Sequence, residues 1–513
     1  MSHPATVRRW RRVPLVALLA IALAAVTLGI ASAPAHAATE EPCDIYAAAG
    51  TPCVAAHSTT RALYAAYDGA LYRVERASDD TFEDIGVLSA GGAADAAEQD
   101  SFCADTTCTI TEVYDQSGHG NDLQFEGTGG AGGEDTASSA TAQAISVYGQ
   151  KAYALYINAG NAYWVNGSSN GVPTGSSPEA EYMVTSGQHY NAKCCFDYGN
   201  SETDRTADGD GAMDAINFGS ECWFGSCTGS GPWVQADLED GLFSGGSDSW
   251  NSSQEALGDS FVTAMLKNNG STEMAIEGGN AQSGSLTTMY DGALPSGYDP
   301  MVKQGAITLG AGGDCCVTKS NGSIGTFYEG VIVSGYPTSA TDAAVQANIV
   351  AANYSAFIPG TEISLQASTS CCTSDYIQHD ASDDKVVLAK LTSSSSSTDK
   401  ADADWIVEPG LYNSSCVSFE SANESGEYLR HSNFELYLEP NDGTTLFSED
   451  ATFCPTTGNS GKGYSLQSVN YPSQYIRHYE YVVYIASDGG SKAWDTTTNW
   501  AADSSWYIAS PWS

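Results

Sequence analysis

Short runs in which apolar and polar residues alternate make up much of this chain, and a period of two is typical of β-strands. The clearest runs are residues 150–157, 233–239 and 326–333. One helix is predicted at residues 341–353, opened by a Ser339-x-x-Asp342 capping box. Frequent turns and scarce helices predict an all-β sandwich of about 320 residues, from Glu41 to about Phe357.

A short phrase recurs three times in the last third of the chain. It reads Tyr-Ile-Gln-His at 376–379, Tyr-Leu-Arg-His at 428–431 and Tyr-Ile-Arg-His at 475–478. Each copy is followed by an aspartate placed three residues before an aromatic residue: Asp402/Trp405, Asp450/Phe453 and Asp503/Trp506. A period of roughly 50 residues indicates one supersecondary unit per copy. Three such units predict a closed, three-lobed all-β module with up to three equivalent surface sites.

These patterns divide the chain into four parts. Residues 1–37 are a predicted signal peptide, 38–357 the sandwich, 358–362 a linker around Ile358-Pro359-Gly360, and 363–513 the repeat module. The signal peptide is predicted from four arginines before an apolar run at 15–30 and from Ala35-His36-Ala37, after which cleavage is expected. An uncleaved membrane anchor is the alternative, but the run is short for a membrane span. The paired arginines also permit a twin-arginine export route.

The charge of the chain is strongly negative. The formal net charge is −42, and removing residues 1–37, with four arginines and no acids, gives −46. Such a surface repels nucleic acid and anionic membranes, so neither is an expected partner. The charge instead suits a neutral partner and a soluble, extracellular protein.

Fourteen cysteines in a chain predicted to be secreted indicate disulfides. Pairs close enough in sequence to be candidates are Cys43/Cys53, Cys103/Cys108, Cys222/Cys227 and Cys416/Cys454. Three further pairs are adjacent: Cys194-Cys195, Cys315-Cys316 and Cys371-Cys372. A bond between neighbours closes a strained eight-membered ring, so at least one adjacent pair could instead reach across space. Metal binding is disfavoured, because no Cys-x-x-Cys or histidine-rich spacing accompanies the pairs.

Two segments are candidates for chemistry. In the strand at 233–239 the period of two places Trp233, Gln235, Asp237 and Glu239 on one face, which suits the floor of a cleft for a sugar. The alternative is a solvent-facing strand in a very acidic protein. The second segment, Leu309-Gly-Ala-Gly-Gly-Asp-Cys-Cys, places Asp314 on a glycine-rich loop, although an ordinary Gly-Asp turn would look the same.

Several motifs, in the same order over nearly the whole mature chain, resemble the secreted α-L-arabinofuranosidases of glycoside hydrolase family 54 with a C-terminal family 42 carbohydrate-binding module. They are Cys43-Asp-Ile-Tyr, Thr51-Pro-Cys-Val-Ala-Ala-His-Ser-Thr-Thr-Arg61-Ala-Leu-Tyr, Tyr114-Asp-Gln-Ser-Gly, Cys194-Cys-Phe-Asp-Tyr-Gly and Gly325-Thr-Phe-Tyr-Glu-Gly. The resemblance implies a jelly-roll-like β-sandwich followed by a β-trefoil.

The resemblance also implies roles for residues of the sandwich. Glu239 would be the nucleophile and Asp314 the general acid/base of a retaining glycosidase. Expected substrate contacts are Asp237, Asp240, Gly313, Trp223 and a Cys194–Cys195 disulfide under the furanose ring. The chain departs from the family pattern at Asp240-Gly241, where asparagines are usual, and in having Cys222/Cys227, Cys315-Cys316 and Cys371-Cys372.

In the repeat module the resemblance implies two arabinofuranose sites. Repeat two would use His431, Asn433, Phe434 and Asp450, and repeat three would use His478, Glu480, Val483 and Asp503. The alternative is that these are scaffold positions kept for packing. Repeat one keeps His379 and Asp402 but has no matching apolar residue, and there the packing interpretation is preferred.

The sequence as a whole predicts a secreted exo-α-L-arabinofuranosidase, active as a monomer without cofactor or metal on arabinoxylan or arabinan. The alternatives are a related pentosidase such as a β-xylosidase, and a polysaccharide-binding lectin without catalysis.

Overall fold

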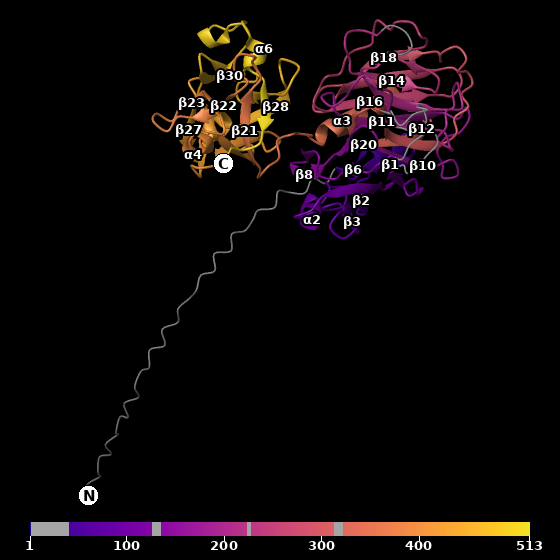
Figure 1. Cartoon of the computed structure of the whole chain (residues 1–513), viewed down its shortest axis with the longest axis horizontal. Helices are drawn as coiled ribbons and strands as arrows, with labels where there is room; N and C mark the ends of the chain where they lie inside the picture. Colours follow the sequence, from indigo (N-terminus) through magenta and orange to yellow (C-terminus); the bar gives the residue numbers. More distant parts are fainter. Residues whose placement is uncertain (2–39, 126–134, 223–226, 312–321, 513) are drawn as a thin grey trace. The chain divides into compact units, whose positions relative to one another are not determined.

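The structure is a computed structural model that describes residues 1, 40–125, 135–222, 227–311 and 322–512 (Figure 1). The predicted signal peptide and the site candidates Trp223, Gly313 and Asp314 therefore lie outside the described residues, as do Cys315 and Cys316. Within the described residues, no helix is long and apolar enough to cross a membrane.

Two antiparallel sheets form the sandwich. The first has the order β1-β20-β11-β16-β17-β18, with β9 paired to β20. Its strands are β1 (Cys53–Ser58), β9 (Leu155–Ile157), β11 (Glu179–Thr185), β16 (Val262–Asn268), β17 (Met274–Asn280), β18 (Thr287–Gly292) and β20 (Gly325–Ser334).

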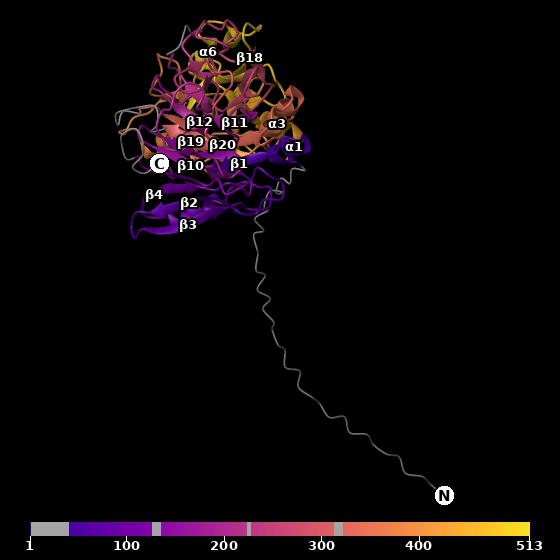
Figure 2. The same cartoon turned by 90° about the vertical axis from the view of Figure 1, so that its right-hand side faces the viewer.

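The second sheet has the order β15-β14-β13-β12-β19-β10-β5-β4-β2-β3, with β6 paired to β4. Figure 2 shows β2, β3 and β4 side by side at its end. The strands are β2 (Ala70–Arg76), β3 (Thr81–Gly86), β4 (Cys108–Val113), β5 (Leu123–Phe125), β6 (Ser138–Ser139), β10 (Ala162–Asn166), β12 (Phe196–Ser201), β13 (Asp214–Gly219), β14 (Trp233–Asp237), β15 (Leu242–Phe243) and β19 (Ala306–Ala311).

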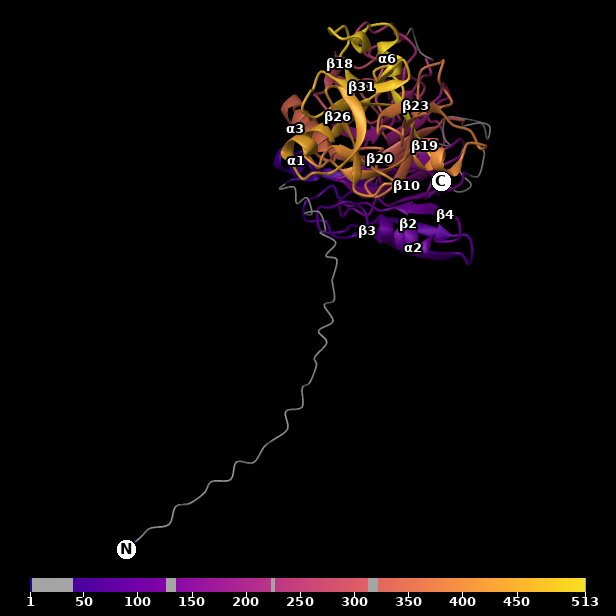
Figure 3. The same ribbon diagram turned by 90° about the vertical axis from the view of Figure 1, so that its left-hand side faces the viewer.

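Every residue of β11 and β16 is buried, because both faces of the first sheet are covered. One face packs on the second sheet and the other on α1 (Pro42–Ala48) and α3 (Ser339–Ala351), which lie side by side in Figure 3. The remaining helix of the sandwich is α2 (Ala96–Phe102), and β7 (Ala144–Val147) pairs with β8 (Gln150–Tyr153) as a separate hairpin.

Buried ion pairs tie these layers together. Nζ of Lys303 lies 2.8 Å from Glu179 of β11 and 3.2 Å from Asp214 of β13, so one cation links the two sheets. On the outer face, Arg61 donates to Glu41 at 2.7 Å and to Glu329 of β20 at 2.7 Å. Removing one member of such a pair would leave a buried charge without its partner.

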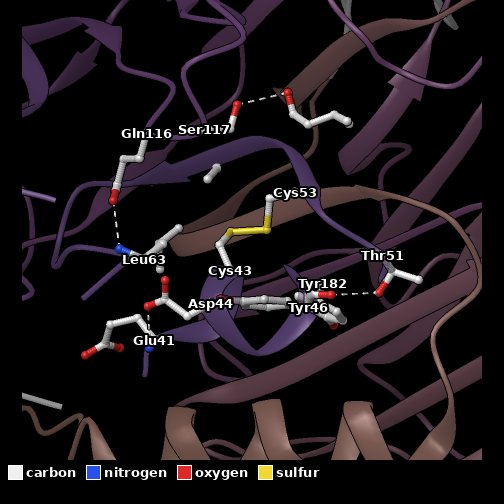
Figure 4. The surroundings of a disulfide bond; sticks show 12 residues. Glu41, Cys43, Asp44, Tyr46, Thr51, Cys53, Leu63, Gln116, Ser117 and Tyr182 are labelled. Atoms are coloured by element: carbon white, nitrogen blue, oxygen red, sulfur yellow. Dashed lines mark hydrogen bonds between the residues drawn. A yellow bond between two sulfur atoms is a disulfide. The ribbon is translucent and has the colours of Figure 1, made fainter. Parts of the chain in front are cut away.

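The start of the sandwich is fixed by a disulfide between α1 and β1, Cys43–Cys53 (Figure 4). The ring of Tyr46 stacks on Tyr182 of β11 with centroids 6.4 Å apart, which seats α1 on the first sheet. The side chain of Asp44 accepts from the backbone nitrogen of Glu41, the reciprocal half of a capping box.

Three sequence predictions need correction in detail. The predicted helix begins at Ser339, two residues early, and its N-cap is Thr338, whose side chain accepts from the nitrogen of Thr341. The predicted strand at 150–157 is two strands, because Gln150–Tyr153 pairs with β7 as β8, while Leu155–Ile157 pairs with β20 of the first sheet as β9. The predicted strand at 233–239 ends at Asp237, because the chain turns at Glu239 and Asp240, which have positive φ.

The C-terminal part is a β-trefoil, and its strands form one continuous sheet. The strands are β21 (Glu362–Ala367), β22 (Asp375–His379), β23 (Val386–Lys390), β24 (Asp404–Pro409), β25 (Val417–Ser421), β26 (Glu427–Ser432), β27 (Glu435–Pro440), β28 (Phe453–Thr457), β29 (Tyr464–Ser468), β30 (Tyr475–Tyr479), β31 (Val482–Ala486) and β32 (Trp506–Ala509). Its short helices are α4 (Ser397–Ala401), α5 (Thr445–Asp450), η1 (Ala493–Asp495) and α6 (Trp500–Asp503).

The repeated phrases occupy equivalent places in this module. They lie on β22, β26 and β30, and each repeat's aspartate stands at the end of a short helix, α4, α5 or α6. The aromatic residue three positions later is fully buried in each repeat: Trp405, Phe453 and Trp506. The aromatic half of the repeat is therefore the module's core.

The four disulfides predicted from nearby cysteines are all present. Cys194–Cys195 and Cys371–Cys372 are each bonded to their neighbour, so neither reaches across space.

Candidate functional site

The strand β14 lies in the interior of the protein and not at its surface. Asp237 is 7% exposed and Glu239 is 4% exposed, while Trp233 and Gln235 are also buried. The alternative of a solvent-facing strand is therefore wrong. Across the sheet, Gln235 lies opposite Asn217 of β13, and Asn217 lies opposite Asp197 of β12. Together they form a row of polar side chains on the face that carries Asp237.

Glu239 stands in a tight turn that ends β14. Glu239 and Asp240 have φ of 59° and 50°, and the chain then returns as β15, with Asp237 opposite Leu242. Two successive positive φ values in a two-residue hairpin loop are usually adopted by Asn-Gly or similar pairs. A glutamate there carries backbone strain of about 1–3 kcal/mol, and such strain is concentrated at functional sites.

Contacts with the surrounding chain hold this turn. The backbone nitrogen of Glu239 donates to Oδ1 of Asp237 at 3.2 Å, and the hydroxyl of Tyr298 donates to the carbonyl of Glu239 at 3.1 Å. Burial, and then the negative charges of Asp210, Asp240 and other aspartates, raise the pKa of Tyr298. The hydroxyl therefore keeps its proton and remains a donor. Asp240 itself is exposed.

The Cys194–Cys195 disulfide lies against Asp237. One sulfur atom of each cysteine and a carboxylate oxygen of Asp237 all lie within 4.8 Å of one another. Because metal ligation requires thiolates, a disulfide beside a carboxylate is not a zinc site. The arrangement places an apolar sulfur surface beside a hydrogen-bonding group.

Both described ends of the loop that contains Asp314 are fixed near this disulfide. Before the loop, Ala311 of β19 pairs with Phe196, the residue after Cys195. After it, the hydroxyl of Ser323 donates to the carbonyl of Cys195 at 2.9 Å. Asp314 and Gly313 are outside the described residues, and so is Trp223, within the loop closed by Cys222–Cys227.

The sequence prediction missed Glu221. Its side chain is buried, its carbonyl accepts from Nε2 of Gln235 at 3.0 Å, and a Cβ on Gly219 would overlap its carboxylate. It therefore lies over β13, beside the polar row. Burial raises the pKa of Glu221 to about 7. Nothing in the sequence distinguishes this residue from the many exposed acids of the chain.

In lobe two of the trefoil the predicted residues come together. His431 hydrogen-bonds through Nε2 to Oδ1 of Asn470 at 3.0 Å, and Nδ2 of Asn470 donates to Asp450 at 2.8 Å. The rings of His431 and Phe434 each lie 5.4 Å from the ring of Tyr471. Asn433 is exposed beside Phe434. Asn470 and Tyr471 belong to the next repeat, which is why the repeat pattern did not identify them.

Lobe three has the same polar arrangement with different partners. His478 hydrogen-bonds through Nε2 to Oγ1 of Thr369 at 2.9 Å, and that hydroxyl donates to Asp503 at 2.9 Å. Val483, predicted as the apolar residue of the site, is fully buried in the core opposite His478. Tyr481, 63% exposed, stands where lobe two has Phe434, and it follows Glu480 in the same positive-φ turn.

Lobe one also joins its histidine and aspartate. Asn423 accepts from His379 at 3.2 Å and donates to Asp402 at 2.6 Å. The residue after Asn423 is Glu424, so lobe one has a carboxylate where lobe two has the ring of Tyr471. In each lobe a histidine, an aspartate and the Asn or Thr that links them thus form a polar trio. The lobes differ in the apolar side chains beside this trio, which we call its apolar walls. In lobes two and three, burial lowers the pKa of His431 and His478.

Comparison with known proteins agrees with this architecture. A family model described as "Alpha-L-arabinofuranosidase B, catalytic" matches residues 42–355, and one described as "Alpha-L-arabinofuranosidase B (ABFB) domain" matches residues 365–508.

Individual relatives cover nearly the whole chain. A probable α-L-arabinofuranosidase B of Aspergillus clavatus is 50% identical, over 92% of this chain and 95% of the relative. A protein of Trichoderma koningii named arabinofuranosidase/B-xylosidase is 50% identical, over 91% of this chain and 95% of its own. A crystal structure of an arabinofuranosidase complexed with arabinofuranosyl-alpha-1,2-xylobiose is 48% identical, covers 92% of this chain and 99% of that one, and has a TM-score of 0.59. The chain belongs to the α-L-arabinofuranosidase B family of glycoside hydrolase family 54.

Proposed function

We propose that this protein is a secreted, retaining exo-α-L-arabinofuranosidase that removes terminal α-L-arabinofuranosyl residues from arabinoxylan or arabinan. The observation that carries the proposal is the position of Glu239, a buried carboxylate on a strained turn, two residues from an aspartate that lies against a disulfide. The family relationship and the relatives' names support the same activity.

Glu239 is the proposed nucleophile. Its carboxylate attacks the anomeric carbon, the bond to the leaving oxygen breaks, and a covalent arabinosyl-enzyme forms. The turn suits this role because the backbone nitrogen of Glu239 is held by Asp237 and its carbonyl by Tyr298. A nucleophile held in one position loses little freedom when the transition state forms.

Asp314 is the proposed general acid and base. It protonates the leaving oxygen in the first step and takes a proton from water in the second, when that water releases arabinose from Glu239. Support comes from the two ends of its loop, Ala311 and Ser323, which are both bound to the segment that carries Cys195.

The proposed sugar contacts divide into polar and apolar groups. Asp237 holds a furanose hydroxyl, and the Cys194–Cys195 sulfurs cover a face of the ring. Asp240, Gly313 and Trp223 are the other proposed contacts. Asp237, Cys194 and Cys195 are all buried, which suits a site that takes a single terminal sugar and not an internal position of a polysaccharide chain.

The trefoil is proposed to bind arabinofuranosyl side chains of the same polysaccharide through lobes two and three. Lobe two uses His431, Asn433, Phe434 and Asp450, and lobe three uses His478, Glu480 and Asp503. Of the side chains expected for lobe three, buried Val483 has no access to a ligand, and exposed Tyr481 takes its place in the proposal. We also propose that the protein is a monomer and that its domains have the boundaries predicted from the sequence.

The test is turnover of an aryl α-L-arabinofuranoside by the wild-type chain and by Glu239→Ala and Asp314→Ala. Release of the aglycone by the wild type alone is the expected result. Inactive wild-type protein that still binds arabinoxylan would favour the lectin alternative.

A β-xylosidase activity is the second candidate, favoured by the name of the Trichoderma koningii relative. Faster turnover of the aryl β-xyloside than of the arabinofuranoside would identify it.

A further inference from the structure

The Cys371–Cys372 disulfide has no role in the site chemistry described so far. It lies in the loop between β21 and β22, with Cys371 exposed and Cys372 5% exposed and packed in the trefoil core. The same loop contains Thr369, whose hydroxyl joins His478 to Asp503 in lobe three. The disulfide therefore begins two residues from a member of the lobe-three trio.

The equivalent loop forms a wall of the site in lobe two. After β29, Asn470 completes the polar trio and the next residue, Tyr471, places its ring 5.4 Å from the rings of both His431 and Phe434. Tyr471 is 41% exposed, so part of its ring remains free to meet a ligand. In lobe two, the rings of Phe434 and Tyr471, which contact each other, thus form two apolar walls beside the polar trio.

Lobe three has one of these walls as an aromatic ring and lacks the other. Tyr481 corresponds to Phe434, since each is the second residue of a turn with positive φ, 66° and 74°. The residue that corresponds to Tyr471 is Ser370, which offers no ring. The loop here is also two residues longer, with seven steps from Thr369 to Tyr376 against five from Asn470 to Tyr475.

The longer loop is folded back toward the lobe-three trio. The nitrogen of Cys372 donates to the carbonyl of Thr369 at 2.9 Å, and the nitrogen of Asp375 donates to the carbonyl of Cys372 at 2.9 Å. Burial lowers the pKa of His478 and the negative charge of Asp375 opposes that change, so Thr369 and Asp375 both act on this histidine. The disulfide lies between them.

We propose that the Cys371–Cys372 disulfide is the second apolar wall of the lobe-three sugar site, in the place that Tyr471 has in lobe two. The inference rests on the proposed binding of arabinofuranose by lobe three. Sulfur is polarisable and poorly hydrated, so a disulfide packs well against the C–H face of a sugar ring without needing a hydrogen bond. The disulfide carries no charge, so it suits a neutral sugar as ligand even though Asp375 nearby is charged.

The experiment isolates lobe three in the full-length chain. Glu239→Gln prevents hydrolysis of the polysaccharide, and His431→Ala removes binding by lobe two. Affinity for soluble arabinoxylan is then measured by affinity electrophoresis with and without Cys371→Ser/Cys372→Ser. The expected result is a roughly tenfold weaker affinity without the disulfide. Adding Ser370→Tyr to the chain without the disulfide is expected to restore part of that affinity.

The matched control carries the same serine pair with Glu239→Gln and His478→Ala, so that lobe two alone binds. Unchanged affinity there shows that the trefoil remains folded. Equal affinity of lobe three with and without the disulfide would overturn the inference and leave the proposed function intact. If the chain with His431→Ala binds no arabinoxylan while that with His478→Ala does, the lobe-three site itself fails, and the inference with it.

Discussion

The backbone nitrogen of Glu239 donates to the carboxylate of Asp237 at 3.2 Å, so the residue that ends β14 also fixes the turn that follows it. A hydrogen bond to a charged acceptor is stronger than one between neutral groups, about 1.5–3 kcal/mol. That range is comparable with the strain of the positive φ values at Glu239 and Asp240. Asp237 thus stabilises the conformation that presents Glu239, in addition to its proposed contact with the sugar.

Replacing Asp237 separates these two contributions. Asp237→Ala removes the acceptor and is expected to lower kcat for an aryl arabinofuranoside at least tenfold and to lower the melting temperature. Asp237→Asn keeps the Oδ1 acceptor, so it is expected to retain the melting temperature while activity still falls. Steady-state kinetics and calorimetry measure both effects. Wild-type kcat in both variants would contradict the assignment of Asp237.

Gly241 provides a test of the same turn from the other side. A Cβ there would overlap the ring of Phe243 and the hydroxyl of Tyr298, which donates to the carbonyl of Glu239. We expect Gly241→Ala to displace Tyr298, to reduce kcat roughly tenfold and to destabilise the sandwich by about 1–3 kcal/mol. Gly258→Ala is the matched control, because a Cβ at Gly258 meets nothing within 4 Å. Equal effects of the two substitutions would show that overlap at Gly241 is not the cause.

Glu221 gives a prediction for pH dependence. Its pKa is raised from 4.5 to about 7 by burial, so between these values the unfolded chain loses this proton more readily than the folded chain. The contribution of Glu221 to the free energy of unfolding is therefore fully present below pH 4.5 and is lost as pH rises toward 7.

Substituting Glu221→Gln removes that titration. Near pH 4.5 the variant is expected to match the wild type in stability, and at pH 7.5 to be more stable by up to roughly 3 kcal/mol. Calorimetric unfolding at the two pH values measures the difference. A gap between variant and wild type that is the same at both pH values would refute the assigned titration.

The lobes of the trefoil are expected to differ in function. His431→Ala combined with His478→Ala is predicted to weaken retention on insoluble arabinoxylan at least tenfold, while turnover of an aryl arabinofuranoside persists. His379→Ala in lobe one is the control, and it is expected to leave retention unchanged because that lobe lacks apolar walls. A pull-down of the wild type and of these two variants on washed arabinoxylan measures the difference in retention. Loss of retention in the His379 variant would assign a third site.

The sequence determined the elements whose signal is local. A period of two along β14 was enough to identify the strand and its polar face, and the thrice-repeated phrase was enough to predict three lobes. Cysteines five to 38 residues apart were paired correctly for the same reason, since short separations leave few alternatives. The resemblance between motifs then supplied the expected roles of Glu239 and Asp237.

Tertiary structure alone decided which residues complete each site. Asn470 and Thr369 join the histidine and aspartate of a neighbouring repeat, and only closure of the module brings those segments together. Register placed Val483 in the core and left Tyr481 exposed. Glu221 became distinctive only through burial, because its altered pKa arises from the removal of water by the folded chain around it.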